Sequence, residues 1–172
     1  MINDVLDLAK VESGKVEVQL QEMSCQEVLA EVVSTLRPLV ESKSLAFYTV
    51  FPEHTFLVTT ERRVLSQIVF NLGNHAIKLT ESGSVRLELT EWPGQGPGWV
   101  AVHVLDTGKG LRTEEQEKLL RALERAASGT QLDGLGLGLH LCVKLAALIG
   151  GRIEFQSEYG RGSRFTLLIP RT

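Results

Sequence analysis

A glycine-rich segment in the second half of the chain contains the residues best suited to binding an anion. Gly134, Gly136 and Gly138 alternate with leucines and open a predicted helix over about 136–149. Glycines let backbone N–H groups point at an anion, and the N-terminus of a helix adds partial positive charge. The segment therefore indicates a phosphate site. The alternative is a helix that packs closely on another element, with glycines that only provide clearance. It is not a dinucleotide-binding fingerprint, which follows a strand, nor a Walker A loop, which ends in Lys-Ser or Lys-Thr.

A second candidate is an acidic turn directly after an apolar segment. Asp106, Gly108 and Gly110 lie in the sequence DTGKG, which follows a predicted strand over 99–105. A carboxylate at a strand end can accept a hydrogen bond from the amino group of a ligand, such as N6 of adenine. By itself, the sequence is more typical of a turn in which Asp106 caps its own loop.

A third candidate is a polar face on a predicted helix over about 60–79. Asn71, Asn74, His75 and Lys78 stand at positions i, i+3, i+4 and i+7, so they share one face of that helix. Amide, imidazole and ammonium groups in this arrangement could hold a hydrated metal ion and a phosphate. A solvated polar stripe is the ordinary alternative.

These three segments need elements that bring them together, and hydrophobic periodicity predicts those elements. Helices are expected over 1–13, 25–40, 60–79, 113–126 and 136–149, and strands over 16–20, 45–51, 84–90, 99–105, 152–157 and 164–169. Strands and helices do not alternate regularly, which argues against a doubly wound fold. The order predicts an α+β fold, a two-layer α/β sandwich in which helices gather on one face of a mixed sheet.

Composition excludes several classes of protein. The 172 residues are 43% hydrophobic and 23% charged, which is typical of one globular domain. The net charge of −3 disfavours a general nucleic-acid binder, which needs a basic surface. Cys25 and Cys142 form no CxxC pair, so neither a disulfide framework nor a structural zinc site is expected. No apolar stretch has membrane-spanning length and MINDVLDLAK lacks a signal-peptide core, so a cytoplasmic location is expected.

Taken together and in this order, the three segments resemble the N, G1 and G2 boxes of the ATP-binding domain of sensor histidine kinases, in the GHKL superfamily. The resemblance runs from about residue 1 to Pro170 and includes ERRVLSQIVFNLGNHAIKLTESGSV and SEYGRGSRFTLLIP. MINDVLDLAKVESGK is similar to the end of the family's dimerisation and phosphoacceptor helix with its linker. The resemblance implies a division into the helix end and linker, 1–14, and a catalytic domain with a Bergerat-type ATP-binding fold, 15–172.

The resemblance implies ATP and Mg²⁺ as ligands and assigns the base side of the site by position. Asp106 matches the aspartate that reads adenine. Gly108 and Gly110 match the glycines that let the loop close over the base. Thr166 matches a threonine on the strand beside the adenine pocket.

The phosphate side is assigned in the same way. The residues that the resemblance places there are Asn71, Lys78, Arg125, Gly134, Gly136 and Gly138. The asparagine matches one near magnesium and phosphate, which makes it the candidate metal ligand, and the lysine matches a phosphate contact. The arginine matches a lid residue that meets the γ-phosphate, and the three glycines match the hinge and phosphate side of the lid.

The sequence departs from the family's pattern at the second asparagine of the N box, which is a magnesium ligand. His75 occupies that position, and Asn74, one residue earlier, points about 100° away around the helix. Because Mg²⁺ prefers oxygen ligands, a weakened dependence on Mg²⁺ is expected, with His75 left as a contact to phosphate. Leu120 and Leu123 stand where the family has phenylalanines that anchor the lid.

The family transfers phosphate to a histidine on an upstream helix, and none of the four histidines, at 54, 75, 103 and 140, lies in such a sequence. The chain is therefore expected to be the donor half of a protein-histidine kinase in two-component signalling. The expected partners are the phosphoacceptor and dimerisation domain of the parent kinase and a response-regulator receiver domain, with dimerisation only in the full-length protein. The alternative is a degenerate domain that acts as a signalling scaffold. A gyrase-, HSP90- or MutL-like ATPase fits less well, because those enzymes need a carboxylate base at the place of Asn71.

Overall fold

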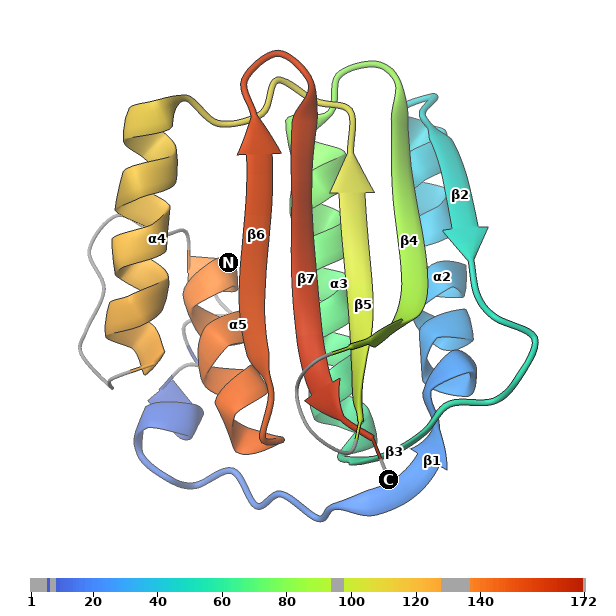
Figure 1. Cartoon of the computed structure of the whole chain (residues 1–172), viewed down its shortest axis with the longest axis vertical. Helices are drawn as coiled ribbons and strands as arrows, with labels where there is room; N and C mark the ends of the chain where they lie inside the picture. Colours follow the sequence, from blue (N-terminus) through green and yellow to red (C-terminus); the bar gives the residue numbers. More distant parts are fainter. Residues whose placement is uncertain (1–5, 7–8, 94–97, 128–136, 172) are drawn as a thin grey trace.

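The structure of the chain is a computed structural model (Figure 1). It describes all residues except 1–5, 7–8, 94–97, 128–136 and 172, and at 125–127 and 137 it describes the backbone alone. The strands are β1 (Gln21–Ser24), β2 (Ala46–Val50), β3 (Leu57–Thr60), β4 (Ser84–Trp92), β5 (Trp99–Asp106), β6 (Arg152–Glu158) and β7 (Gly162–Pro170). The helices are α2 (Cys25–Ser42), α3 (Arg62–Leu79), α4 (Thr113–Ala127) and α5 (Leu137–Leu148).

The strands form one large and one small sheet. The large sheet has the strand order β2-β4-β5-β7-β6, and β1 pairs with β3 in the small one. β2 runs parallel to β4, whereas the other neighbours in the large sheet are antiparallel. Figure 1 shows α2, α3 and α5 behind one face of the large sheet, and α4 beside its β6 edge. The predicted α+β sandwich with helices on one face of a mixed sheet is therefore confirmed.

The main core lies between the large sheet and these helices. Alternate residues of the two central strands project into it, and all of them are buried: Val100, Val102, Val104, Phe165, Leu167 and Ile169. The apolar residues predicted for the buried face of α3 are buried as well: Val64, Leu65, Ile68, Val69 and Leu72. Burying this face fixes the rotation of α3 about its axis, so its polar face must lie on the less buried side.

Local sequence explains where α2 starts and how closely it packs. Ser24 caps the helix, because its hydroxyl accepts the N–H of Glu27 at 3.4 Å. Pro38 lies inside α2 on its exposed side, and the helix continues to Ser42. α2 lies so near α3 that a Cβ on Gly73 would come within 2.6 Å of the buried Leu36 side chain. A larger residue at that position would separate the two helices.

The expectation of a strand over 16–20 is wrong, and one strand of the structure was not predicted. Residues 16–20 alternate in polarity but have no regular secondary structure, because Val18 packs against the core without joining a ladder. The first strand is β1 instead, and it pairs with β3, a strand that the sequence analysis missed. β3 has four residues and directly precedes α3, so the start of the helix obscured it. None of the described helices is both long enough and apolar enough to cross a bilayer.

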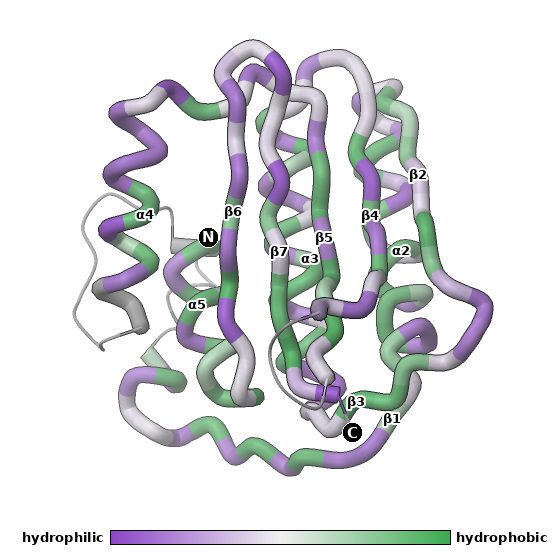
Figure 2. The backbone as a smooth tube through the Cα atoms, in the orientation of Figure 1, coloured by the Kyte–Doolittle hydropathy of each residue, from purple (hydrophilic) through white to green (hydrophobic). Residues whose placement is uncertain are grey.

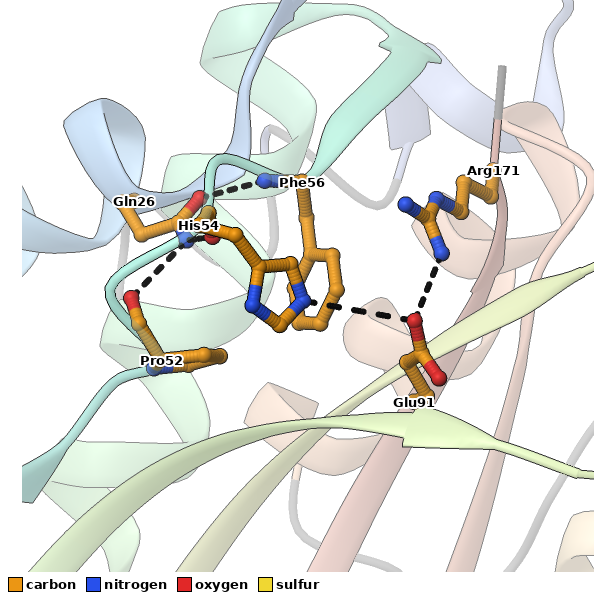
Figure 3. A network of polar contacts seen from close by, with 6 residues as sticks. All are labelled: Gln26, Pro52, His54, Phe56, Glu91 and Arg171. Carbon is orange, nitrogen blue, oxygen red and sulfur yellow. Dashed lines mark hydrogen bonds and ion pairs between the residues drawn. The ribbon is translucent and has the colours of Figure 1, made fainter.

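A polar network joins the loop before β3 to the ends of β4 and β7 (Figure 3). The Gln26 amide spans that loop, because Nε2 donates to the His54 carbonyl at 2.6 Å and Oε1 accepts the Phe56 N–H at 3.0 Å. Arg171 donates to Glu91 at 2.8 Å, and its guanidinium lies 5.0 Å from the centroid of the Phe56 ring. These contacts fasten the chain after β7 beside β3.

The face of the large sheet that points away from the helices contains a buried histidine. His103 on β5 is 5% exposed. Its Nδ1 lies 2.8 Å from the hydroxyl of Thr166 and its Nε2 lies 3.0 Å from the hydroxyl of Thr90, so side chains join three strands. Burial lowers the pKa of His103 and the charge of Arg164 acts in the same direction, while Glu88 acts against them.

Stability should therefore fall when His103 is protonated. Because the pKa of His103 is lower in the folded protein than its unfolded value of about 6.5, the unfolded chain takes up the proton first as the pH falls. The contribution of the neutral histidine is present above about pH 6.5 and is lost below it. We expect His103→Gln to reduce the pH dependence of the unfolding free energy by at most about 1.4 kcal/mol per pH unit.

Urea unfolding of the wild type and His103→Gln at a series of pH values measures this difference. His54→Gln, the same change at an exposed position, is the control. The slope should shrink without vanishing, because burial also lowers the pKa of His140. Equal pH dependence in the wild type and His103→Gln would contradict the expectation.

Candidate functional site

The acidic turn lies at the end of β5, where the chain leaves the large sheet. Asp106 pairs with Ser163 of β7 in the ladder and is 6% exposed. The Gly108 N–H donates to Asp106 Oδ1 at 2.9 Å, and the backbone N–H of Ser163, the ladder partner, also favours the charged carboxylate. Burial raises the pKa of Asp106, and these two N–H groups oppose the rise by stabilising the charged form. A carboxylate has about four acceptor positions, so two backbone donors leave room for a ligand.

Glycines let the backbone pass close to this carboxylate. A Cβ on Gly108 would lie 2.6 Å from the carbonyl oxygen of Leu79, at the end of α3. Gly110 and Gly162 have φ values of +68° and +119°, which favour glycine. A Cβ on Gly162 would collide with the carbonyl oxygen of Asp106. The turn is therefore seated between the end of α3 and the start of β7, where side chains do not fit.

The predicted polar face of α3 lies towards the same region. Asn71 and Asn74 are half-buried, whereas His75 and Lys78 are exposed. The ring of His75 is edge-on to the ring of Phe165, with 5.9 Å between the centroids. Phe165 lies two positions along β7 from the partner of the buried aspartate, on the same face of the sheet. The structure therefore brings the helix face and the acidic turn to one side of the large sheet.

Asn71 carries an unsatisfied donor. Its side-chain Nδ2 is buried and has no hydrogen-bond partner among the described residues. Because buried polar groups are normally bonded, an unpaired one is typical of a site that a ligand completes. An amide nitrogen is a donor, so the ligand atom that fits it is an acceptor such as a phosphate oxygen.

His75 has a shifted pKa although its side chain is exposed. Desolvation by the surrounding protein lowers the pKa of His75, and the positive charge of Lys78 acts in the same direction. His75 is therefore neutral at pH 7, and Lys78 is left as the cation on this part of the helix face. A neutral imidazole can donate one hydrogen bond to a phosphate or offer one nitrogen to a metal.

The structure does not bring Thr166 to the buried aspartate. Thr166 is three residues from Ser163 along β7, so its side chain lies on the opposite face of the sheet, where it bonds His103. Thr166 therefore lies on the predicted strand but faces away from the buried aspartate, and Ser163 is the residue of β7 beside Asp106. A signal was available in the sequence, because Ser163 shares the strand alternation of the apolar Phe165.

Part of the predicted phosphate side cannot be placed. Gly134 and Gly136 lie outside the described residues, and of Arg125 only the backbone, near the end of α4, is described. Gly138 is half-buried in the first turn of α5. Of the predicted phosphate residues, Asn71, Lys78 and Gly138 are therefore the ones that have a described position.

The two leucines that replace the family's phenylalanines have different surroundings. α4 is mostly hydrophilic (Figure 2) and packs on α5. Leu123 is buried in this packing, whereas Leu120 is 53% exposed. One of the two leucines therefore anchors α4, and the other leaves an apolar side chain on its surface.

The described part of the chain offers little to a divalent metal. It contains no group of three or more His, Cys, Asp or Glu residues placed to hold one ion. The helix face supplies the amide oxygen of Asn71 and a nitrogen of His75, whereas Mg²⁺ prefers six oxygen ligands. These residues fit a magnesium ion poorly, and most of its ligands would have to be phosphate oxygens and water.

Residues 60–172 match the family model of histidine kinase-, DNA gyrase B-, and HSP90-like ATPases. The chain belongs to this ATPase family. The matched range includes α3, the acidic turn and β7, which form the candidate site, and it also includes the glycine-rich segment.

Curated proteins that are similar to nearly the whole chain include sensor kinases. The autoinducer 2 sensor kinase/phosphatase LuxQ of Vibrio cholerae is 32% identical over 173 residues, which cover 99% of this chain and 20% of LuxQ. The sensor histidine kinase RcsC of Escherichia coli K12 is also 32% identical, over 99% of this chain and 18% of RcsC. The chain therefore spans about a fifth of the length of the curated relatives it matches.

Solved structures similar to this chain share its fold. Full-length ShkA in complex with AMPPNP superposes with a TM-score of 0.81 and 27% identity, over 99% of this chain and 35% of ShkA. The catalytic domain of the histidine kinase ThkA gives a TM-score of 0.70 at 22% identity, over 90% of this chain and 98% of ThkA, and supports the fold alone. The fold is that of histidine kinase ATP-binding domains.

Proposed function

We propose that this chain is the ATP-binding catalytic domain of a sensor histidine kinase, which donates the γ-phosphate of ATP to a histidine on a dimerisation helix. The observation that carries the proposal is the buried carboxylate of Asp106, which keeps free acceptor positions at the end of β5. The family match supports a nucleotide as the ligand. The complex of the similar protein ShkA with AMPPNP supports ATP in particular.

On the base side, Asp106 accepts a hydrogen bond from the N6 amino group of adenine. Guanine has a carbonyl oxygen at the equivalent place, which would set acceptor against acceptor. The low exposure of Asp106 strengthens a correct bond and makes a mismatch costly. Gly108 and Gly110 let the backbone approach the base, because neither carries a Cβ.

On the phosphate side, the unpaired amide of Asn71 donates to a phosphate oxygen, and Lys78 offsets the negative charge. Gly138 lies in the first turn of α5, where the backbone N–H groups at the helix start are suited to a phosphate. Arg125, near the end of α4, supplies a further positive charge to the γ-phosphate. The contribution of these residues is to position the phosphates and to neutralise charge, as phosphoryl transfer requires.

The transfer needs an acceptor histidine outside this domain. His103 and His140 are buried in the folded chain, so neither can receive a phosphate without unfolding. We assign residues 1–14 to the end of a dimerisation helix with its linker and 15–172 to the catalytic domain. The partners are then the phosphoacceptor domain of the parent kinase and a response-regulator receiver domain, and the site of action is cytoplasmic.

A second candidate function is a degenerate domain that acts as a signalling scaffold. His75 favours this candidate, because it replaces an oxygen ligand with a nitrogen ligand. The buried, backbone-held Asp106 disfavours it, because a domain without a nucleotide has no use for the free acceptor positions of a buried carboxylate. The tests below separate the two candidates.

Asp106→Asn should weaken ADP binding by about 1.5–3 kcal/mol, roughly 10- to 150-fold, because a neutral amide replaces the charged acceptor. Isothermal titration calorimetry with ADP measures the loss. Glu88→Gln makes the same chemical change on the opposite face of the sheet and should bind as the wild type does. Unchanged binding by Asp106→Asn, or a wild type that binds no ADP, would show that the base pocket is misplaced.

His75→Asn should strengthen the dependence of ATP binding on Mg²⁺. The change restores an amide oxygen on the helix face, so the ratio of ATP affinity with and without Mg²⁺ should rise roughly tenfold. Titrations of ATP in the presence of Mg²⁺ or a chelator give this ratio for both proteins. His54→Asn, at an exposed site in the loop before β3, is the control. An equal ratio in the wild type and His75→Asn would remove the main argument for a degenerate kinase.

The isolated chain should not label itself with phosphate from radiolabelled ATP, because it lacks an acceptor helix. It should label a separately supplied phosphoacceptor domain of its parent protein, and Asp106→Asn should reduce that labelling in step with the loss of nucleotide affinity. Acid-labile phosphate on the gel band of each protein provides the measurement. Stoichiometric phosphohistidine on this chain alone would refute the division into donor and acceptor halves.

A further inference from the structure

The hydroxyl of Ser157, near the end of β6, lies against the loop that carries the buried aspartate. It accepts the backbone N–H of Leu111 at 2.8 Å, and it donates to the carbonyl oxygen of Gly162 at 3.1 Å. It also lies 2.9 Å from the hydroxyl of Ser163. If Ser163 donates that bond, Ser157 uses its one donor and both acceptor positions. A single half-buried hydroxyl therefore joins three backbone segments.

These bonds reach both ends of the loop from Asp106 to Leu111. At one end, Ser157 holds Leu111 directly, just before α4 begins. At the other end, it holds the first residues of β7, where Ser163 stands opposite Asp106 in the ladder. Gly162, between Ser157 and Asp106, approaches the Asp106 carbonyl so closely that a Cβ would collide with it. A shift of Ser157 would therefore move the segment of β7 that packs against Asp106.

The turn between β6 and β7 holds the middle of the same loop. The Gly160 N–H donates to the carbonyl oxygen of Lys109 at 2.6 Å. Beyond the loop, the guanidinium of Arg112 donates to the Tyr159 hydroxyl at 2.9 Å and lies 4.4 Å from its ring centroid. Tyr159 and Arg112 are exposed, so water competes with their contact, whereas the bonds of Ser157 are half-buried. Ser157 is therefore the side chain of the β6–β7 hairpin that holds the loop through half-buried bonds.

We propose that Ser157 is a positioning residue of the nucleotide site. It sets the direction of the Asp106 carboxylate through the start of β7 and sets the start of α4 through Leu111. Ser157 does not touch the nucleotide, and its effect on binding passes through Asp106. The inference rests on the proposed function, because it concerns the base side of the same site.

The test compares Ser157→Ala with Gln156→Ala in calorimetric titrations with ADP. Gln156 is the adjacent residue of β6 and also bonds across to β7, where it accepts from Arg164, but its side chain lies on the other face of the sheet. Ser157→Ala should weaken ADP binding about tenfold, whereas Gln156→Ala should bind as the wild type does. Ser157→Thr keeps the hydroxyl and should restore affinity. Equal affinities for the wild type and Ser157→Ala would overturn the inference.

A double-mutant cycle with Asp106→Asn separates positioning from general stability. If Ser157 acts through Asp106, Ser157→Ala should cost little further affinity in the Asp106→Asn background. Additive losses would mean that Ser157 only stabilises the hairpin, and would overturn the inference. If Ser157→Ala does not fold, the nearly isosteric Ser157→Cys should bind more weakly than Ser157→Thr, and equal binding would overturn it. A wild type that binds no ADP refutes the proposed function instead, so the two failures are distinguishable.

Discussion

A carboxylate that is buried at the end of a central strand is the constraint on which the site depends. Taking a charge out of water costs several kcal/mol unless fixed donors replace the lost hydration. Here the donors are backbone N–H groups from the turn after β5 and from the neighbouring strand β7. Such donors keep their positions only while the two strands and the turn stay together. The glycines at 108, 110 and 162 permit this closeness, and a side chain at any of them would separate the donors from Asp106.

One face of the helix α3 belongs to the core, and its other face belongs to the site. Its apolar face packs against the sheet, and Gly73 lets α2 approach it, so the helix can neither rotate nor move away. The polar face is therefore fixed in direction, and the edge-on contact between His75 and Phe165 ties it to β7. A substitution on this face, such as the histidine where the family has an asparagine, changes the chemistry of the site while the scaffold stays the same.

Much of the fold could be predicted from the sequence, because strong periodicity and clear caps define its longer elements. α2 begins at its predicted serine cap, and α3 buries its predicted residues. The predictions failed for segments whose structure depends on whether a partner strand is available. Residues 16–20 alternate like a strand but have no partner strand among the described residues, and β3 is too short to stand out beside α3. Whether a segment joins a ladder depends on residues far away along the chain.

The candidate site could be predicted by segment but not fully by residue. Motif order led to Asp106 and to the polar face of α3, since both are local patterns. Thr166 lies on the strand that the likeness in sequence indicated, but the alternation of that strand turns its side chain away from Asp106. The bonds of Ser157 and Ser163 require three segments to come together in space, and no local sequence pattern predicts such a contact.

Because Arg171 is held beside β3, the place where a following domain could be attached is fixed relative to the sheet. β5 and β7 are antiparallel, with Asp106 opposite Ser163 at one end and Trp99 opposite Pro170 at the other. The seven residue steps between these pairs separate the acidic turn from the exit of the chain by about 24 Å, at roughly 3.4 Å per residue. Figure 1 shows the C-terminus at the opposite pole of the sheet from that turn. Any module joined beyond Arg171 would start at this far pole, so its size would not obstruct the acidic turn.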